Sequence, residues 1–390
     1  MYILLVGGTW APSEMGGAKK SGFVEKCGLA LQDYGCRVVV YNGGDYEDLP
    51  LIAETAPDFD AVLWWPNVSN DLPKIRDIKE NAPRIMLVNS KRNDNDKYSF
   101  MELIQRSLAI KANLTVELKK NNEGKFRIMV FDPLGCAWYN GENIHDAMFA
   151  MAKRLDFLRS ITRQATVSDH TDKGLVLSWY FDHFKQEMHH FDADIAAPDE
   201  ERFIALVKRY AERFHEIMKP ANNVVRFLGN ASMRPAPPQV GRCSKGMPSF
   251  RCGKYIFVSQ RNVNKEFINL SHFVPAYLEN EKVYYCGENK PSVDTPIQLR
   301  LYAKLPNINY MIHSHCYVEG APFTTMSVPC GAIEEVEEVL TALNENYGDL
   351  NGKRYILNLI GHGSLIMGEC VDDLEGIVYY GRQLPEIIES

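Results

Sequence analysis

Two histidines spaced one residue apart, His313 and His315, follow the apolar run Tyr310–Ile312. Successive side chains of a β-strand alternate between its two faces, so side chains at positions i and i+2 lie on the same face. If the apolar run is the end of a strand, the two imidazoles project together. Paired imidazoles suit a divalent transition metal such as Zn²⁺. Many such pairs are only surface histidines, so the rest of the chain must decide between the two interpretations.

A third histidine, His362, follows the apolar run 355–360 and is itself followed by a glycine. We expect this run to be a strand as well, which places His362 at a strand end. His189 and His190 lie instead in a charged stretch, and we expect them to be solvated. Cys316 comes directly after the first histidine pair, and we expect it to pack in the core rather than to bind a metal.

The elements that must position these side chains are strands and helices in two different patterns. The first part of the chain alternates short apolar, β-rich runs with helical ones, which predicts a doubly wound parallel sheet. Two further β-rich runs, on either side of residues 121–124, predict a hairpin. The strand candidates are 2–7, 37–42, 61–66 and 84–89, and the helix candidates are 21–35, 50–59, 99–112 and 143–164.

The remainder of the chain predicts a connector and a second domain. Residues 166–220 are rich in charged and aromatic side chains, and helical apolar spacing follows Pro198. We therefore predict a Rossmann- or flavodoxin-like α/β domain over 1–165, a helical connector over 166–220, and an α/β or α+β domain over 221–390. Within the last, strands are expected near 254–259, 282–286, 308–313 and 355–360, and helices near 294–304 and 331–346.

The loop after the first strand is a second candidate site. In doubly wound sheets ligands bind at this edge, and a helix N-terminus attracts anions. Gly16 and Gly17 would give backbone access and Lys19 and Lys20 positive charge, so we expect a phosphate, nucleotide or sugar-phosphate site. The stretch also fits a flexible loop with two solvated lysines. The chain has neither GxGxxG nor GxxxxGK[ST], which argues against dinucleotide and P-loop binding.

The composition of the 390 residues limits the classes of partner and the cellular compartment that we expect. The net charge is −7 and there is no basic block, so nucleic acid is not an expected partner. Nine scattered cysteines with no CxxC pair indicate a reducing compartment, and we expect a cytoplasmic protein. The apolar N-terminus is short and reads as a first strand, and no stretch approaches the ~18 apolar residues of a membrane span.

Four motifs of the second domain share their order with a known family. They are Gly229-Asn230-Ala231-Ser232, Pro291-Ser292-Val293-Asp294-Thr295-Pro296, His313-Ser314-His315 and His362-Gly363. Over about 225–390 the chain resembles the class II aldolase/adducin family, which shows G-N-x-S, then P-S-S-E-T-P and a helix, then H-x-H, and finally H-G. The resemblance implies a class II aldolase-like α/β/α domain.

The resemblance also implies a metal site and a proton-transferring group. The family's histidines bind a divalent metal, so the ligands would be His313, His315 and His362, holding Zn²⁺ or another divalent transition metal with one coordination position open. The family's acid/base glutamate corresponds to Asp294, whose side chain is one methylene shorter. A second interpretation, which can hold together with the first, is that Asp294 caps the helix that follows it, since Asp before Thr-Pro is a favoured N-cap.

The substrate-binding part of the family pattern is only partly kept. The matching positions are Asn230, Ser232, Arg261, Asn262 and Ser292. Val293 stands where the family has its second serine, and Arg261-Asn262 stands where Ser-Gly is usual. Because an arginine binds phosphate or carboxylate with two hydrogen bonds, the substrate is expected to be a small molecule that carries an anion.

We therefore predict a metal-dependent lyase that makes or breaks a carbon–carbon bond through an enediolate, on a sugar phosphate or related anionic carbonyl compound. An epimerase, a dehydratase or a decarboxylase could use the same site, and a nucleotide- or sugar-binding first domain would make the enzyme bifunctional. The three histidines and the carboxylate argue against a non-catalytic, adducin-like module. The family also implies a homo-oligomer, commonly a tetramer, whose second acid/base can come from a neighbouring subunit; Tyr379 and Tyr380 are candidates.

Overall fold

A computed structural model of the protein describes residues 1–12, 17–68, 75, 78, 82, 85–110, 112–120, 124–132, 137–164, 187–193, 195–218, 229–234, 255–261, 263–328, 331–360 and 362–380. These residues fall into two compact units, one within Met1–His183 and the other within Phe184–Leu384. In the part of the chain that is described, no helix combines the length and the apolar character needed to cross a membrane.

The first unit is built on a sheet whose strands run in the order β2-β1-β3-β5-β6-β7-β8, with β4 beside β1. Neighbouring strands from β2 to β6 are parallel, whereas β6-β7 and β7-β8 are antiparallel. Apart from the short β4, the parallel part has the 2-1-3-4-5 order of flavodoxin-like sheets. The strands are β1 Tyr2–Ala11, β2 Arg37–Asp45, β3 Ala61–Trp64, β4 Asn67–Val68, β5 Met86–Arg92, β6 Leu114–Lys120, β7 Phe126–Phe131 and β8 Ala137–Gly141.

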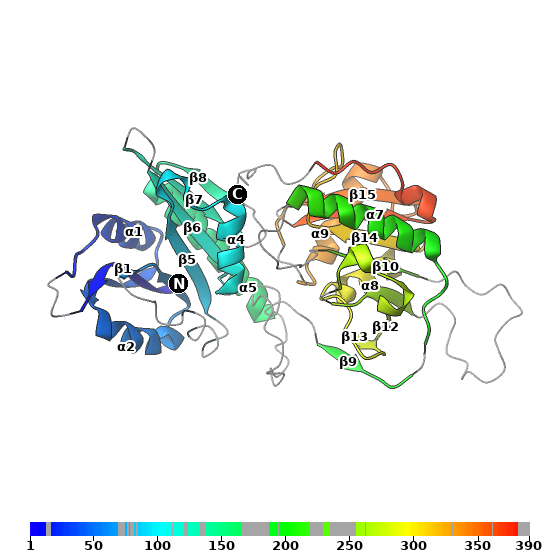
Figure 1. Ribbon diagram of the computed structural model, residues 1–390, viewed down its shortest axis with the longest axis horizontal. Coiled ribbons are helices and arrows are strands. Elements are labelled where there is room, and N and C mark those ends of the chain that lie inside the picture. The colour runs from blue at the N-terminus through cyan, green and yellow to red at the C-terminus, as the bar shows by residue number, and fades with distance from the viewer. Residues whose placement is uncertain are drawn as a thin grey trace, which may run out of the picture. The chain divides into compact units, whose positions relative to one another are not determined.

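Helices pack on both faces of this sheet (Figure 1). Leu4 and Val6 of β1 share a buried cluster with Leu49 of α2. The alternate residue Leu5 lies near Gly28 of α1, on the opposite face. The predicted doubly wound sheet and the predicted hairpin are therefore confirmed, and an antiparallel edge extends the sheet. The helices of this unit are α1 Gly22–Asp33, α2 Leu49–Glu54, α4 Phe100–Ala109 and α5 Ile144–Gln164, with short 3₁₀ turns at Tyr46–Asp48, Ala56–Asp58 and Asp94–Asp96.

The second unit contains a separate sheet in the order β15-β16-β14-β10-β11-β12-β13-β9. All its pairs are antiparallel except β13-β9. The strands β10 and β14 are central, and the ends of central strands are where a buried site can form. The strands are β9 Met188–His190, β10 Gly229–Met233, β11 Ile256–Ser259, β12 Phe273–Glu279, β13 Lys282–Tyr285, β14 Tyr310–Ser314, β15 Arg354–Leu359 and β16 Gly363–Gly368.

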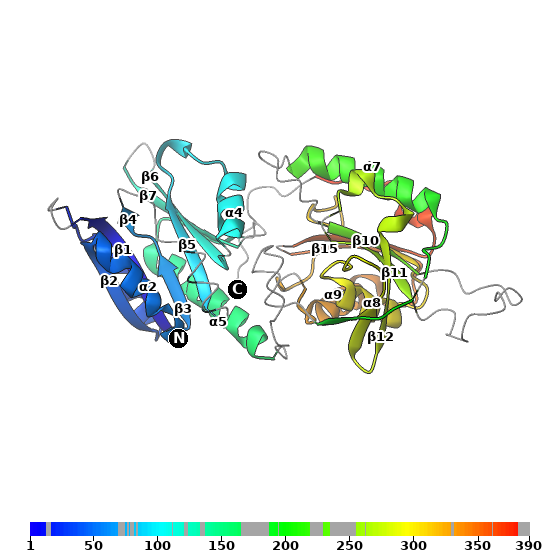
Figure 2. The same cartoon turned by 60° about the horizontal axis from the view of Figure 1, so that its bottom comes forward.

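The helices of the second unit cover both faces of its sheet. Figure 2 shows α7 on one face and α8 and α9 on the other. Phe203 of α7 packs with Ile312 and Ile366, whereas Met311 and Met367 face the cluster of α8 and α9. The predicted α/β/α domain is therefore confirmed. Its helices are α7 Glu201–Met218, α8 Thr295–Lys304 and α9 Glu335–Tyr347, with 3₁₀ turns at Lys265–Phe267, Leu270–His272 and Val371–Leu374.

The stretch predicted as a connector over 166–220 contributes to the second unit where it is described. The helix expected after Pro198 is present as α7, and its apolar side chains belong to the core of this unit. β9 pairs with β13 at the edge of the sheet, and the side chain of His190 is 47% exposed. Helical periodicity shows that a helix has an apolar face, but not which sheet that face covers. Residues 165–186 and 219–228 lie outside the described residues.

Candidate metal centre

Three histidines meet at the end of the central strand β14. His313 lies within β14, His315 lies just beyond its end, and His362 directly precedes β16, the neighbour of β14. The ring centroids are 5.1 Å apart for His313 and His315, 4.5 Å for His313 and His362, and 4.9 Å for His315 and His362. One ring nitrogen from each residue can be chosen so that all three lie within 4.8 Å of one another. The side chains are buried, with 4%, 5% and 1% of each residue exposed.

Two glycines allow the backbone segments to approach closely enough for this convergence. Gly363 has φ +146°, and a Cβ added there would lie 1.9 Å from the Ser314 carbonyl oxygen. Gly229, on the other neighbour of β14, has φ +133°, and a Cβ there would lie 2.5 Å from the His313 carbonyl oxygen. Side chains other than hydrogen rarely fit such conformations and distances. These positions explain physically why G-N-x-S and H-G begin or end with glycine in this sequence.

Hydrogen bonding orients the ring of His313 for binding a cation. Its Nδ1 lies 3.0 Å from the carbonyl oxygen of Ser364. A carbonyl oxygen only accepts hydrogen bonds, so Nδ1 carries the hydrogen and Nε2 of the neutral ring carries the lone pair. Metal-binding histidines commonly donate their other ring N–H to such an acceptor. The donor set and this hydrogen bond therefore fit a divalent transition metal held by three imidazoles.

His362 has a carboxylate partner that the sequence analysis missed. Its Nδ1 lies 2.7 Å from Oε1 of Glu335, a buried residue in the first turn of α9. Burial raises the pKa of Glu335 to about 8. A cation held by His362 would act in the opposite direction and favour the ionised carboxylate, which accepts the Nδ1 hydrogen. The sequence signal for its burial is helical spacing, since Glu335 lies four residues before the buried Val339 of the same helix.

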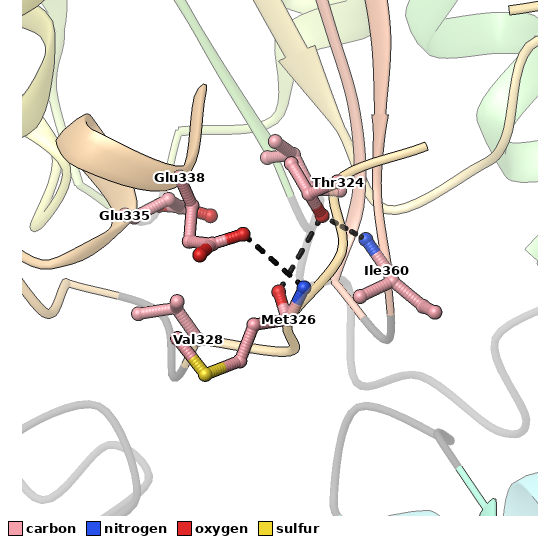
Figure 3. Close-up of a pocket in the computed structure, with 7 residues that line it drawn as sticks. Thr324, Met326, Val328, Glu335, Glu338 and Ile360 are labelled. Atoms are coloured by element: carbon pink, nitrogen blue, oxygen red, sulfur yellow. Dashed lines mark hydrogen bonds between the residues drawn. The ribbon is translucent and has the colours of Figure 1, made fainter. Parts of the chain in front are cut away.

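A pocket beside Glu335 shows how the turn that carries His362 is held (Figure 3). The Ile360 backbone N–H donates to Thr324 Oγ1 at 2.9 Å, and the His362 backbone N–H donates to the Leu359 carbonyl at 2.9 Å. On the other side, the Met326 N–H donates to a Glu338 carboxylate oxygen of α9 at 3.2 Å. Hydrogen bonds from a loop and a helix thus fix the turn on which His362 depends.

Asn230 holds the carboxylate of Asp294 and lies beside His313 in the sheet. Asn230 stands opposite His313 in the β10–β14 pair, so the two side chains project from the same face of the sheet. The Asn230 Nδ2 donates to Asp294 Oδ2 at 2.6 Å, and Gln298 donates to Asn230 Oδ1. Asp294 occupies the N-cap position of α8, but its side chain makes no capping hydrogen bond. The alternative that its carboxylate serves as the helix cap is therefore wrong.

The other predicted substrate-binding residues lie in two places. Ser292 accepts a hydrogen bond from the Asp294 backbone N–H at 3.4 Å, and Arg261 Nε donates to the Pro291 carbonyl at 2.9 Å. Both therefore lie at the turn that carries Asp294. Ser232 is fully buried, with its hydroxyl 3.1 Å from the Tyr302 hydroxyl. Asn262 lies outside the described residues. A substrate-binding role for these four residues stays a prediction.

The two tyrosines and the cysteine near this region have different surroundings. Tyr379 is 2% exposed, with its ring 4.7 Å from that of Phe214, whereas Tyr380 is 39% exposed. Cys316 belongs to the buried cluster beneath α7, as the sequence predicted.

Lys265 is a second buried charged residue that the sequence did not single out. It lines a small cavity that Asn230 and His313 also line.

The predicted ligand loop of the first unit is more exposed to solvent than the histidine cluster. Lys19 forms backbone hydrogen bonds with Thr9 in both directions, at 2.8 and 3.2 Å, and Lys19 and Lys20 are both exposed. Gly17 is half-buried, and Gly16 lies outside the described residues. A ligand role for this loop stays a prediction.

Comparison with known proteins finds a family that is similar to part of the second unit. Residues 213–374 match the family described as "Class II Aldolase and Adducin N-terminal domain", which confirms the resemblance inferred from the motifs. No curated protein is significantly similar to the chain.

Solved structures give weaker similarities. A sugar-phosphate aldolase from Thermotoga maritima has 14% identity and a TM-score of 0.30, covering 43% of this chain and 87% of its own. An L-fuculose 1-phosphate aldolase from Glaciozyma antarctica has 12% identity and a TM-score of 0.26, covering 47% and 70%. A DNA/pantothenate metabolism flavoprotein from Streptococcus pneumoniae has 12% identity and a TM-score of 0.32, covering 40% and 99%.

Proposed function

Since residues 213–374 match the class II aldolase/adducin family, we propose that the protein is a metal-dependent lyase. It makes or breaks a carbon–carbon bond next to a carbonyl, through an enediolate, on a sugar phosphate or related anionic compound. The observation that carries this proposal is the buried cluster of His313, His315 and His362, whose ligand nitrogens lie within 4.8 Å of one another. Three imidazoles leave one coordination position open, as in catalytic zinc sites.

The chain's own groups have separate roles in this proposal. The three histidines hold Zn²⁺ or another divalent transition metal, which when bound polarises a substrate carbonyl and offsets the negative charge of the enediolate. In the condensation direction Asp294 accepts the proton from the carbon next to the carbonyl, and in the cleavage direction it returns that proton. The Asn230 amide, 2.6 Å from the carboxylate, orients Asp294 for this transfer.

Two further parts of the proposal concern partners. The substrate is a small anionic molecule, because cationic side chains lie next to the candidate site. The chain assembles as a homo-oligomer, as is common for this family. Sedimentation velocity over a range of protein concentrations tests the second part, and a single monomeric species at every concentration would contradict it.

Metal content tests the central claim. The wild-type chain is purified without chelator beside His313→Ala and the matched control His190→Ala, which removes a histidine from the edge strand of the same unit. Elemental analysis should find about one divalent metal per chain in the wild type and the control, and none in His313→Ala. Circular dichroism of all three proteins checks that the fold is retained.

The reaction is tested by assaying aldol cleavage over a set of sugar phosphates and related anionic carbonyl compounds. The same assays, read for epimerised, dehydrated or decarboxylated products, separate the other reactions that begin by removing the same proton. If the wild type contains no metal and takes up none on addition, the lyase proposal is wrong. A non-catalytic binding module would then be the better account of the fold.

A further inference from the structure

Gln298 is a buried polar residue on the helix that follows the proposed acid/base. Asp294 precedes α8 and Gln298 lies one turn later, so the Gln298 backbone N–H donates to the Asp294 carbonyl at 2.9 Å. Residues four apart lie on the same side of a helix. Gln298 is 2% exposed, and its side chain reaches Asn230 of β10, on the sheet face that α8 covers (Figure 2).

Two linked hydrogen bonds join Gln298, Asn230 and Asp294, and the carboxylate fixes their direction. An ionised carboxylate only accepts hydrogen bonds, so the Asn230 atom that lies 2.6 Å from Asp294 Oδ2 is the donor Nδ2. The other end of the same amide, Asn230 Oδ1, then needs a donor, and Gln298 Nε2 supplies it. Gln298 therefore determines which end of the Asn230 amide faces Asp294.

The other end of the Gln298 amide is a cost to the fold. Its Oε1 is buried and accepts no hydrogen bond from the residues that the structure describes. Burying an amide oxygen without a partner is unfavourable, whereas an apolar side chain of similar size would carry no such cost. A buried polar atom without a partner is more often found where function, rather than stability, selects the residue.

The hydrogen bonds of Asn230 also suit a positioning role. Its Nδ2 donates to Asp294 and its Oδ1 accepts from Gln298, so protein groups engage both ends of the amide. All three residues are buried, and buried side chains that are packed and hydrogen-bonded keep one geometry. The amide of Asn230 thus transmits the position of one α8 side chain to another.

We propose that Gln298 is a positioning residue for the reaction. By donating to Asn230 Oδ1, it keeps the Asn230 N–H on the Asp294 carboxylate and so keeps this carboxylate aimed for proton transfer. Gln298 acts through Asn230 and not on the substrate. This inference rests on the proposed function, because it concerns the proton-transferring group of the same site.

The orientation of the Asn230 amide can be measured on the full chain without substrate. In protein that carries ¹⁵N in its asparagines, the Asn230 side-chain NH₂ signals are identified by their absence from Asn230→Ala, and their exchange with D₂O is followed by NMR. We expect these hydrogens to exchange about 3- to 10-fold faster in Gln298→Met, the range for losing one hydrogen bond. The matched control Leu301→Val, a buried change on the same helix, should exchange them at the wild-type rate.

Proton transfer is measured with dihydroxyacetone phosphate, whose hydrogens next to the carbonyl exchange with D₂O when a base removes them. Gln298→Met should lower the maximal exchange rate about 10- to 100-fold, because a small displacement of a reacting group has effects of this size. The KM should change less than about 2-fold, because the glutamine acts on the base and not on substrate binding. Gln298→Glu keeps the shape but places an acceptor against Asn230 Oδ1, so the amide turns round and the rate should fall at least as far.

A double variant separates positioning from a general effect on folding. In the Asn230→Ala background, Gln298→Met should lower the rate less than about 2-fold further, because residues that act through one another are not additive. Unchanged amide exchange in Gln298→Met, an equal rate loss in Leu301→Val, or a full further loss in the double variant would each overturn the assignment. Amide exchange needs neither metal nor substrate, so it decides the role of Gln298 even if the wild type takes up no metal and the proposed function is refuted.

Discussion

The two candidate ligand regions differ in how many segments of the chain build them. In the second unit, His313 and His315 at the end of β14 meet His362 from the turn before β16, and Glu335 reaches the same cluster from α9. In the first unit, the predicted residues come from a single loop, and its two lysines are exposed. The histidine cluster thus joins distant parts of the sequence, whereas the loop of the first unit uses residues that are close together in the sequence.

This difference determines how strongly the charged and polar groups of each region can interact with a ligand. Buried groups interact in a medium of lower effective dielectric constant, and their positions are fixed by packing on several sides. Exposed lysines are hydrated and screened by salt within about 8–10 Å. A loop with suitable residue types is therefore a weaker indication of a site than side chains that converge from separate strands and helices.

Glycine substitutions test this comparison with the largest expected effect. Gly363→Ala places a Cβ 1.9 Å from the Ser314 carbonyl oxygen, and Gly43→Ala in the first unit places one 2.7 Å from the Lys19 carbonyl oxygen, both at positive φ. We expect each change to lower the free energy of unfolding by about 2–4 kcal/mol through backbone strain and overlap. Only Gly363→Ala should also lose the metal, because it displaces the turn that carries His362.

The measurement is urea denaturation followed by fluorescence, together with elemental analysis. Gly320→Ala is the control, since it has positive φ but open space around its Cβ. Equal metal content in Gly363→Ala and Gly43→Ala would show that the histidine cluster does not depend on this close approach, and would remove the contrast between the two regions.

A smaller effect is expected from the residue behind the histidines. Glu335→Gln removes the charge that accepts the His362 Nδ1 hydrogen, which should weaken metal affinity about 10- to 100-fold, as is typical for such partners. Competition with a chromogenic chelator measures this affinity. Glu337→Gln, an exposed neighbour on the same helix, should bind metal like the wild type. If both variants match the wild type, Glu335 contributes only to packing.

The smallest effect is a pH dependence of stability. The pKa of Lys265 is about 8 in the folded protein and 10.5 in its ordinary state. Between these values the unfolded chain holds a proton that the folded chain has lost, so this group makes stability rise with pH, by about 1 kcal/mol per pH unit. Below pH 8 both states are protonated and the contribution is constant. Lys265→Met should lack this rise in urea denaturation between pH 8 and 10, whereas Lys20→Met should keep it.

Much of the fold could be predicted from local patterns. The sequence predicts a helix over 143–164, and α5 is found at Ile144–Gln164. The four strand candidates of the doubly wound sheet overlap β1, β2, β3 and β5. The strands β10, β12 and β16 were not among the candidates. β10 reads GNASM, with small and polar residues, β12 contains Pro275, and β16 begins and ends with glycine. Such sequences become strands because of their partners, which local propensity does not contain.

The candidate site, like the fold, could be predicted from local sequence patterns only in part. The spacing of His313 and His315 and the glycine after His362 were visible in the sequence, and the structure brings the three side chains together. Glu335 and Lys265 were not identified, because each lies in a charged stretch that would be equally at home on a surface. Only the packing of α7 and α9 against the sheet buries these two charges.

The position of α7 and β9 has a practical consequence for producing the second unit on its own. The family match begins at residue 213, inside α7, and β9 lies earlier still. A recombinant fragment trimmed to that boundary would lack most of the helix that covers Ile312 and Ile366, and it would leave β13 without its neighbour β9. An uncovered apolar face beside an unpaired strand edge promotes association between chains. Fragments intended for crystallisation should therefore begin before Met188.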